Sequence, residues 1–159
     1  MKKTLFITLI FSNLVFTQNI DFEGFMNFSY SNNSGKIHLE INNLDKEFLY
    51  INSLSRGIGN NDLGLDRGQL GNTRIVFFTK RGNKILMVQP NTRYVSNSDN
   101  YLENKAVEEA FARSVLFSFE IIEEKNNNYI IDLTPLLMKD AHGVAQRLRF
   151  SNSGNYSLN

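Results

Sequence analysis

Apolar and polar residues alternate along much of the chain between Gly24 and Pro90, a pattern typical of strands that bury one face. The alternation is clear at 24–31 and at 36–41, where every second residue from Ile37 onward is apolar. Between these runs lies "NNSG" at 32–35, a sequence typical of tight turns. We therefore predict a β-hairpin over 24–41.

Five further runs have the composition of strands, and two pairs of them are separated by turn sequences. "RGN" separates one pair and "KNNN" the other, so each pair predicts another hairpin, and Pro90 ends the first of these ladders. The runs are 47–54, 73–80, 84–90, 117–124 and 129–133.

Two segments change to a helical period. The first runs from 101 to 117, has Ser98, Asp99 or Asn100 as its N-cap, and carries a narrow apolar stripe around Val107. The second begins at Thr134 and Pro135, with proline at the first helical position. Its apolar residues recur at intervals of three and four: Leu137, Ala141, Val144 and Leu148. The pattern predicts an α+β fold in which two amphipathic helices accompany a mostly antiparallel sheet of hairpins.

The first seventeen residues form a separate unit. Lys2 and Lys3 precede an apolar run, and the small residues Val15 and Thr17 suit the −3 and −1 positions of a signal peptidase site. We predict that residues 1–17 are a secretory signal peptide and that the protein is exported, to the periplasm or beyond it. The chain has no cysteine, which leaves neither a lipid attachment site nor disulfides.

Length and charge restrict the remaining chain. Residues 18–159 suit one domain, and the hydrophobic fraction of 42% is typical of a globular protein. Cleavage would leave 15 of the 17 basic residues against 16 acidic ones, a net charge of −1. Such a chain offers no electrostatic reason to bind nucleic acid or an anionic membrane, and no membrane span follows the signal peptide.

A glycine-rich loop at 57–72, "GIGNNDLGLDRGQLGN", is the most unusual segment. It is not a phosphate-binding loop, because Leu65 and Asp66 follow Gly64 where a P-loop requires Lys and a hydroxyl residue. Asn60, Asp62 and Asp66 offer oxygens at alternate positions, as calcium sites do, but the glycine and glutamate of an EF-hand are missing. The remaining interpretation is an ordered connection shaped by glycines and by Asp/Arg pairs, on which a partner docks.

Catalytic chemistry has little support. His38 lies on the polar side of its run, and His142 follows Asp140 by two residues, which on a helix places the two side chains on different faces. "HGVAQ" lacks the glutamate and second histidine of HExxH. No GxSxG motif supports a serine nucleophile. The residues alone predict no catalytic or metal site and no cofactor.

Several stretches together resemble a known family. They are "GKIHLEI", "EFLYINSLSRGIGNNDLGLDRGQLG", "TRIVFF", "NTRYVSNSDN", "AVEEAFARSVLFSF" and "LLMKDAHGVAQRL". In this order and spacing they resemble the N-terminal region, a domain of unknown function, of large secreted bacterial zinc-dependent metalloproteases with a metzincin-like catalytic domain. The resemblance covers about residues 24–157, and "GNNDLGLDRGQLG" with the later "DAHG" carries most of its specificity.

The resemblance implies an accessory role. Members of that family hold zinc through an HExxH helix further along the chain, and no position here matches it. The resemblance therefore implies that this chain is a fragment, incomplete at its C-terminus. Its expected partner is the catalytic domain of the parent protease, if that domain is encoded downstream. Zinc is expected only in that missing domain.

Three functions remain open at this stage. The chain is an accessory domain of a metallopeptidase, an independent exported module that binds protein or glycan through loop 57–72, or, least supported, an autonomous enzyme. The residues expected to form the loop or interface come from the two specific segments: Asn61, Asp62, Gly64, Asp66, Arg67, Gln69, Asp140, His142 and Gly143.

Overall fold

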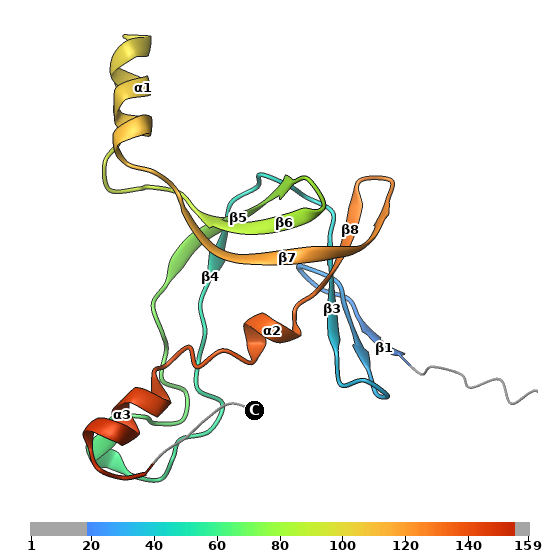
Figure 1. The fold of residues 1–159 in the computed structure, drawn as a ribbon, viewed down its shortest axis with the longest axis vertical. Helices are drawn as coiled ribbons and strands as arrows, with labels where there is room; N and C mark the ends of the chain where they lie inside the picture. Colours follow the sequence, from blue (N-terminus) through green and yellow to red (C-terminus); the bar gives the residue numbers. More distant parts are fainter. Residues whose placement is uncertain (1–18, 155–159) are drawn as a thin grey trace, which may run out of the picture.

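Eight antiparallel strands form a single strongly twisted sheet in this computed structural model, which describes residues 19–154 (Figure 1). The strand order is β1-β2-β3-β8-β7-β6-β5-β4, so β1 and β4 are the two edges. The strands are β1 (Asn19–Phe22), β2 (Phe28–Ser31), β3 (Ile37–Ile41), β4 (Phe48–Tyr50), β5 (Arg74–Arg81), β6 (Lys84–Gln89), β7 (Ser114–Lys125) and β8 (Asn128–Asp132). The predicted signal peptide, residues 1–17, lies outside the described residues.

The three predicted hairpins are all confirmed. β2 pairs with β3, β5 with β6, and β7 with β8, each in antiparallel register. Asn126 and Asn127 turn between β7 and β8 with positive φ angles of 51° and 64°, which asparagine tolerates better than most residues. β1 was not predicted from the sequence; it extends the first hairpin by pairing with β2.

The core lies on one face of the sheet. Alternate residues of the central strands point to this face, and Val76, Ile85 and Ile131 are completely buried there. Irregular registers at Met87/Val88 in β6 and at Ile121/Glu123 in β7 mark bulges. Bulges bend a strand and increase its twist, which helps the sheet to curve around this face.

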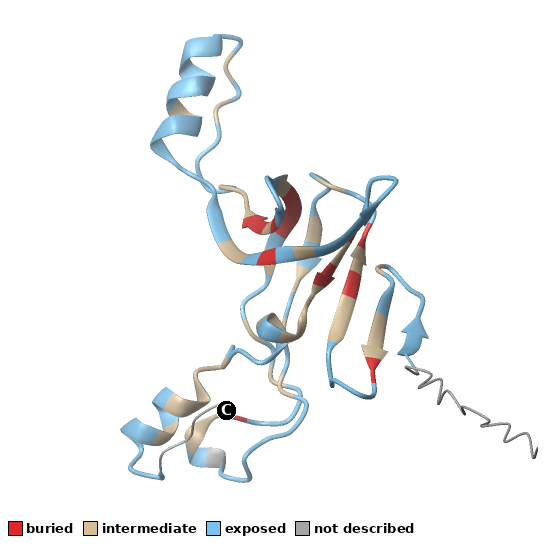
Figure 2. Ribbon diagram, turned by 45° about the vertical axis from the view of Figure 1, so that its right-hand side comes forward, coloured by how far each residue is buried: buried red, intermediate tan, exposed pale blue. Residues whose placement is uncertain are grey.

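The predicted α+β architecture is wrong. The structure is mostly antiparallel sheet, and its helices are α1 (Tyr101–Ala110), α2 (Thr134–Leu137) and α3 (Val144–Phe150), none of which has a buried residue. Figure 2 shows the buried residues concentrated in the strands, while α1 projects from the sheet and is almost entirely exposed. No helical layer covers the sheet within residues 19–154. None of these helices is long and apolar enough to cross a membrane.

The first predicted helix ends early because tertiary pairing overrides helical propensity. Asn100 caps it as predicted, its side chain accepting a hydrogen bond from the Leu102 N–H at 2.9 Å. The helix was expected to reach residue 117, but β7 begins at Ser114 and pairs Val115 with Val88 of β6. Completing the sheet satisfies more backbone groups and buries more apolar surface than another helical turn would.

The second predicted helix is broken into α2 and α3. Gly143 has φ +65°, a left-handed conformation that a continuous helix cannot contain. The Asp140 carboxylate accepts hydrogen bonds from the Val144 and Ala145 N–H groups at 2.8 and 2.9 Å, and so starts a new helix. The apolar periodicity expected of one helix is therefore divided between α2, which packs Leu136 against the core, and α3, which lies far from it (Figure 1).

Asp132 at the end of β8 joins three elements. Its carboxylate accepts the Thr134 N–H at 3.0 Å and lies 3.1 Å from the Lys36 Nζ, while the Thr134 hydroxyl accepts the Ile37 N–H at 2.9 Å. Burial raises the pKa of Asp132, but the hydrogen bonds from Thr134 and Lys36 outweigh it, so that the pKa falls below its ordinary value of 3.8.

We expect Ile131→Ala to destabilise the domain by about 2–5 kcal/mol, because it leaves a cavity at a site with no solvent exposure. Urea unfolding of residues 18–159 measures this free energy. The matched control is Ile122→Ala in the bulge of β7, where the residue is 54% exposed and the change should stay within about 0.5 kcal/mol. Equal losses for the two variants would contradict the placement of the core.

Asp132 should also give the fold an acid-sensitive component. Its pKa is lower in the folded state, so its stabilisation is fully present above the ordinary value of 3.8 and is lost as the pH falls through the folded-state pKa. We expect Asp132→Asn to be less stable than the wild type near pH 6, with the difference shrinking below pH 4. Urea midpoints measured across this range provide the test, and a difference that is independent of pH would contradict the assignment.

Candidate functional site

β4 and β5 continue beyond the sheet as a two-stranded ribbon. Their regular pairing ends at Tyr50 and Arg74, and an isolated antiparallel bridge follows between Ser53 and Leu70. The Leu54 N–H donates to the Gln69 carbonyl at 3.0 Å. The predicted strand 47–54 is therefore a short β4 with an irregular extension, and the glycine-rich loop is the tip of this long hairpin.

The tip of the ribbon is compact. The Ile58 N–H donates to the Leu65 carbonyl at 3.3 Å, and a 3₁₀ turn covers Asn61–Leu63. Leu65 is 1% exposed and is the buried centre of the tip. A Cβ on Gly57 would lie 3.0 Å from both the Arg67 nitrogen and the Leu65 oxygen, so the backbone here leaves no room for a side chain.

α3 packs against this tip. The Arg147 guanidinium donates to the carbonyls of Leu63 and Gly64 at 3.2 and 2.9 Å, across more than 80 residues of sequence. Gly64 turns its carbonyl toward Arg147 with a φ of +59°. We call residues 57–72 together with 140–150 the tip unit; it lies at the end of the molecule opposite α1 (Figure 1).

The tip unit brings together the two sequence segments from which interface residues were predicted. Asp140 caps α3, Gly143 precedes it, and Gly64 bonds Arg147. Asn61 begins the 3₁₀ turn. His142 lies in the turn before α3, so the prediction that it shares a helix with Asp140 is wrong.

The acidic and basic side chains of the loop do not hold its shape. Asp62, Asp66 and Arg67 are exposed, and within residues 19–154 none of them forms an ion pair. The expected Asp/Arg pairs are replaced by backbone hydrogen bonds, among them the Gln69 N–H to the Asp66 carbonyl at 3.1 Å. Among the described residues, these three charged side chains therefore face solvent.

Two polar atoms of the tip unit are buried without a hydrogen-bond partner among the described residues. They are the Oε1 of Gln69 and the Nε2 of His142, and both residues were predicted interface positions. Buried polar atoms are nearly always paired in folded proteins, by protein groups or by water. Within residues 19–154, the buried side-chain polar atoms that lack a partner are therefore both in the tip unit.

A cleft of about 420 Å³ separates the ribbon from the segment that joins α2 to α3. Residues 50–55 line one wall and residues 136–144, including Asp140 and His142, line the other. The Lys139 ammonium lies 4.6 Å from the centre of the Phe117 ring, against the sheet. This volume is within the range of about 300–1,000 Å³ that ligand sites in proteins have.

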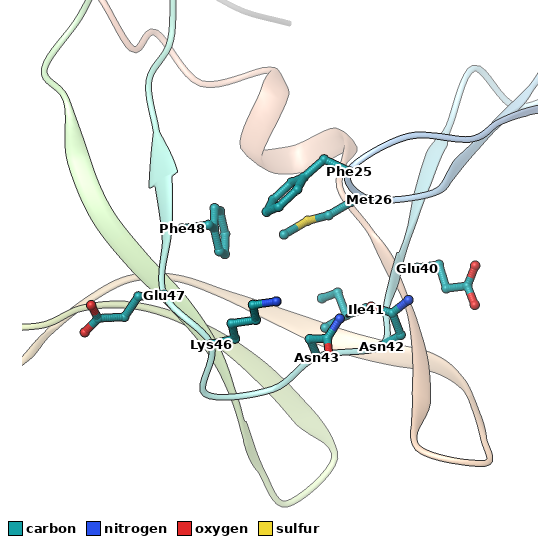
Figure 3. Close-up of a pocket in the computed structure, with 9 residues that line it drawn as sticks. All are labelled: Phe25, Met26, Glu40, Ile41, Asn42, Asn43, Lys46, Glu47 and Phe48. Atoms are coloured by element: carbon teal, nitrogen blue, oxygen red, sulfur yellow. Dashed lines mark hydrogen bonds between the residues drawn. The ribbon is translucent and has the colours of Figure 1, made fainter.

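A second pocket lies inside the curved sheet and is nearly filled. Figure 3 shows Phe25, Met26 and Phe48 converging on it, with Glu40 and Glu47 directed away. Its volume is only about 40 Å³, enough for a few water molecules. It is a small depression beside the core and offers no room for a metabolite.

Metal ligands are dispersed in the part of the chain that the structure describes. Within residues 19–154, no three His, Asp or Glu side chains lie close enough to hold a metal ion together. His38 lies opposite Ser29 and Asp132 on the outer face of β3, as the alternation predicted, but it is half-buried and not fully exposed. The neighbouring strands β2 and β8 flank it on both sides and cover part of the ring.

Arg147, which joins the two halves of the tip unit, was not among the residues predicted from the sequence. Its charge and its place near the end of a predicted amphipathic helix are typical of a solvated residue. Only the juxtaposition of α3 with the carbonyls of the loop reveals its role.

We expect Arg147→Ala to loosen the tip while leaving the sheet intact, because it removes both hydrogen bonds to the loop at a cost of about 0.5–3 kcal/mol. Amide hydrogen exchange should speed up at residues 58–66 and stay unchanged in β6 and β8. Arg149→Ala, on an exposed residue of the same helix, is the control and should leave the exchange of the loop unchanged. The same exchange rates in both variants would show that Arg147 does not hold the tip.

Comparison with known proteins identifies the family. The family model for a domain of unknown function, DUF5117, matches residues 68–158, more than half of the chain. The match begins at the return strand of the ribbon and includes β5–β8 and all three α-helices. No curated protein and no solved structure matches the chain. The chain therefore belongs to the DUF5117 family of domains of unknown function.

Proposed function

We propose that this protein is a non-catalytic accessory domain of an exported zinc-dependent metallopeptidase, and that its tip unit packs against the catalytic domain. One observation carries the proposal. The two segments that gave the resemblance to such proteases most of its specificity, at 59–71 and 140–143, lie about seventy residues apart and fold into one unit, joined by Arg147.

The surface of the tip unit supports a role in packing. Phe150 of α3 is 83% exposed and Leu70 of the ribbon is 63% exposed. Leu137 and Met138, at the end of α2, add further exposed apolar surface nearby in the chain. Burying a large apolar side chain in an interface contributes about 1.5–3 kcal/mol, so a partner that covers these residues would gain substantially.

The role of the loop is structural under this proposal. Its glycines shape the tip and present Asp62, Asp66 and Arg67 toward the partner, and the zinc and its ligands belong to the catalytic domain. Export rests on the N-terminal pattern of Lys2 and Lys3, an apolar run and a small-residue cleavage site. The alternative, an independent exported module that binds protein or glycan through loop 57–72, uses the same exposed surface.

Reading the gene beyond the codon for Asn159 is the first test. A reading frame that encodes HExxH supports the accessory role, whereas an unrelated gene with its own promoter supports the independent module. Where the frame is present, the catalytic segment is expressed separately and titrated with the mature domain, residues 18–159. We expect a one-to-one complex by calorimetry.

Substitutions then locate the interface. We expect Leu70→Ser combined with Phe150→Ser to weaken that complex by about tenfold or more, because two apolar contacts are lost. The control is Leu102→Ser on α1, a residue whose exposure of 70% lies between those of Leu70 and Phe150; α1 lies at the opposite end of the molecule. A complex weakened only by the α1 variant would place the interface elsewhere and contradict the proposal.

A further inference from the structure

The ribbon has one edge on which the backbone is unpaired. β4 is the last strand of the sheet, and its extension is paired on one side only. Asn52 and Leu54 use their backbone groups toward the returning strand: the Asn52 carbonyl accepts the Gly71 N–H at 2.7 Å, and the Leu54 carbonyl accepts the Gly68 N–H at 2.7 Å. Backbone groups alternate in direction along a strand, so those of Ile51 and Ser53 point the opposite way.

These backbone groups have no partner in the described part of the chain. The N–H and C=O groups of Ile51, Ser53 and Ser55 form no backbone hydrogen bond within residues 19–154. They recur at every second residue, which is the spacing at which an added strand offers its own donors and acceptors. The edge therefore has the hydrogen-bonding pattern of a strand that lacks a neighbour.

The unpaired edge lines the cleft beside the tip unit. Residues 50–55 form one wall of this cleft, whereas the returning strand at 68–71 does not contribute to it, so the cleft lies on the free side of the ribbon. The facing wall, residues 136–144, stands apart from the edge and leaves the 420 Å³ between them. Six extended residues span about 20 Å, which allows several backbone hydrogen bonds to form along this wall.

The edge lacks two of the features that protect sheet edges. Natural proteins usually guard an edge strand with a charged residue, a proline or a very short length. β4 itself is only three residues long, but its extension continues the unpaired edge as far as Ser55. Residues 48–55, "FLYINSLS", contain neither a charged residue nor a proline, whereas the opposite edge strand, β1, includes Asp21.

We propose that this edge binds an extended polypeptide segment of a partner protein, which adds to the sheet beside β4 and enters the cleft. Backbone hydrogen bonds from Ile51 and Ser53 supply the affinity. Leu49 and Ile51 are 65% and 40% exposed and share one face of the ribbon, so the segment carries apolar residues at alternate positions, next to these two side chains. The inference concerns the ribbon edge alone and holds whether or not the tip unit packs on a protease.

The test uses a seven-residue peptide of alternating threonine and valine, acetylated and amidated at its ends. It is titrated onto the ¹⁵N-labelled mature domain, residues 18–159. We expect the amide resonances of Ile51 and Ser53 to shift and their hydrogen exchange to slow at least tenfold at saturation. No shift at either amide with millimolar peptide would overturn the proposal.

N-methylated peptides separate backbone pairing from apolar adhesion. One analogue carries N-methyl groups on its threonines and the other carries them on its valines. Because the N–H groups of successive residues point to opposite edges of a strand, each analogue loses the hydrogen-bond donors along one edge. We expect one analogue to bind at least tenfold more weakly than the other. Equal binding of both analogues and the parent peptide would mean that no strand is added.

Two substitutions at one position test the protein side. Ser53→Pro removes an N–H that forms no bond within the fold and blocks the edge, whereas Ser53→Ala retains it. We expect proline to abolish peptide binding and alanine to leave it unchanged, with the exchange protection of the Ile131 amide showing that both remain folded. Binding unaffected by proline would refute the site, and a concentration-dependent dimer that protects the same amides would assign the edge to a second copy of the chain.

Discussion

The main apolar core of this protein lies on one face of one sheet, and much of the rest of the structure follows from that constraint. The core cluster consists of strand residues at alternate positions, and the helices add to it only the half-buried Leu136 of α2. The tip unit and α1 are therefore held by local contacts outside this core. The tip unit depends on backbone hydrogen bonds, on the Asp140 cap and on Arg147, and α1 depends on the chain at its base, where Tyr94 stacks on Phe111 at 4.1 Å.

The contrast between strands that form the core and elements held outside it explains which parts of the fold could be predicted from the sequence. The three hairpins were evident because a two-residue period and a turn sequence are local signals, and the strands themselves bury the apolar positions. The bounds of the helices were not evident from the sequence. The residues after Phe111 fit both a helical and a strand pattern, and pairing with the neighbouring strand β6 favours the strand. Gly143 is a residue that disfavours a continuous helix, but its left-handed conformation became clear only in the structure.

The structure brings together two segments that were singled out from the sequence, but the contacts between them could not be predicted. Loop 57–72 and the segment around His142 were singled out from the sequence, yet no periodic pattern shows that two loops meet. Arg147 makes that connection through main-chain carbonyls, which carry no sequence signal. The unpaired ribbon edge was equally hidden, because whether a strand has a neighbour is a property of topology.

The hydrogen bonds between Arg147 and the carbonyls of Leu63 and Gly64 also have a consequence for the order of folding. They close a loop of more than 80 residues, and contacts of such separation form late because the entropy of the intervening chain opposes them. That chain includes β5 to β8, half of the strands of the sheet. The tip therefore acquires its final shape only after the sheet has formed, and a chain with a misfolded sheet would not present this surface at all.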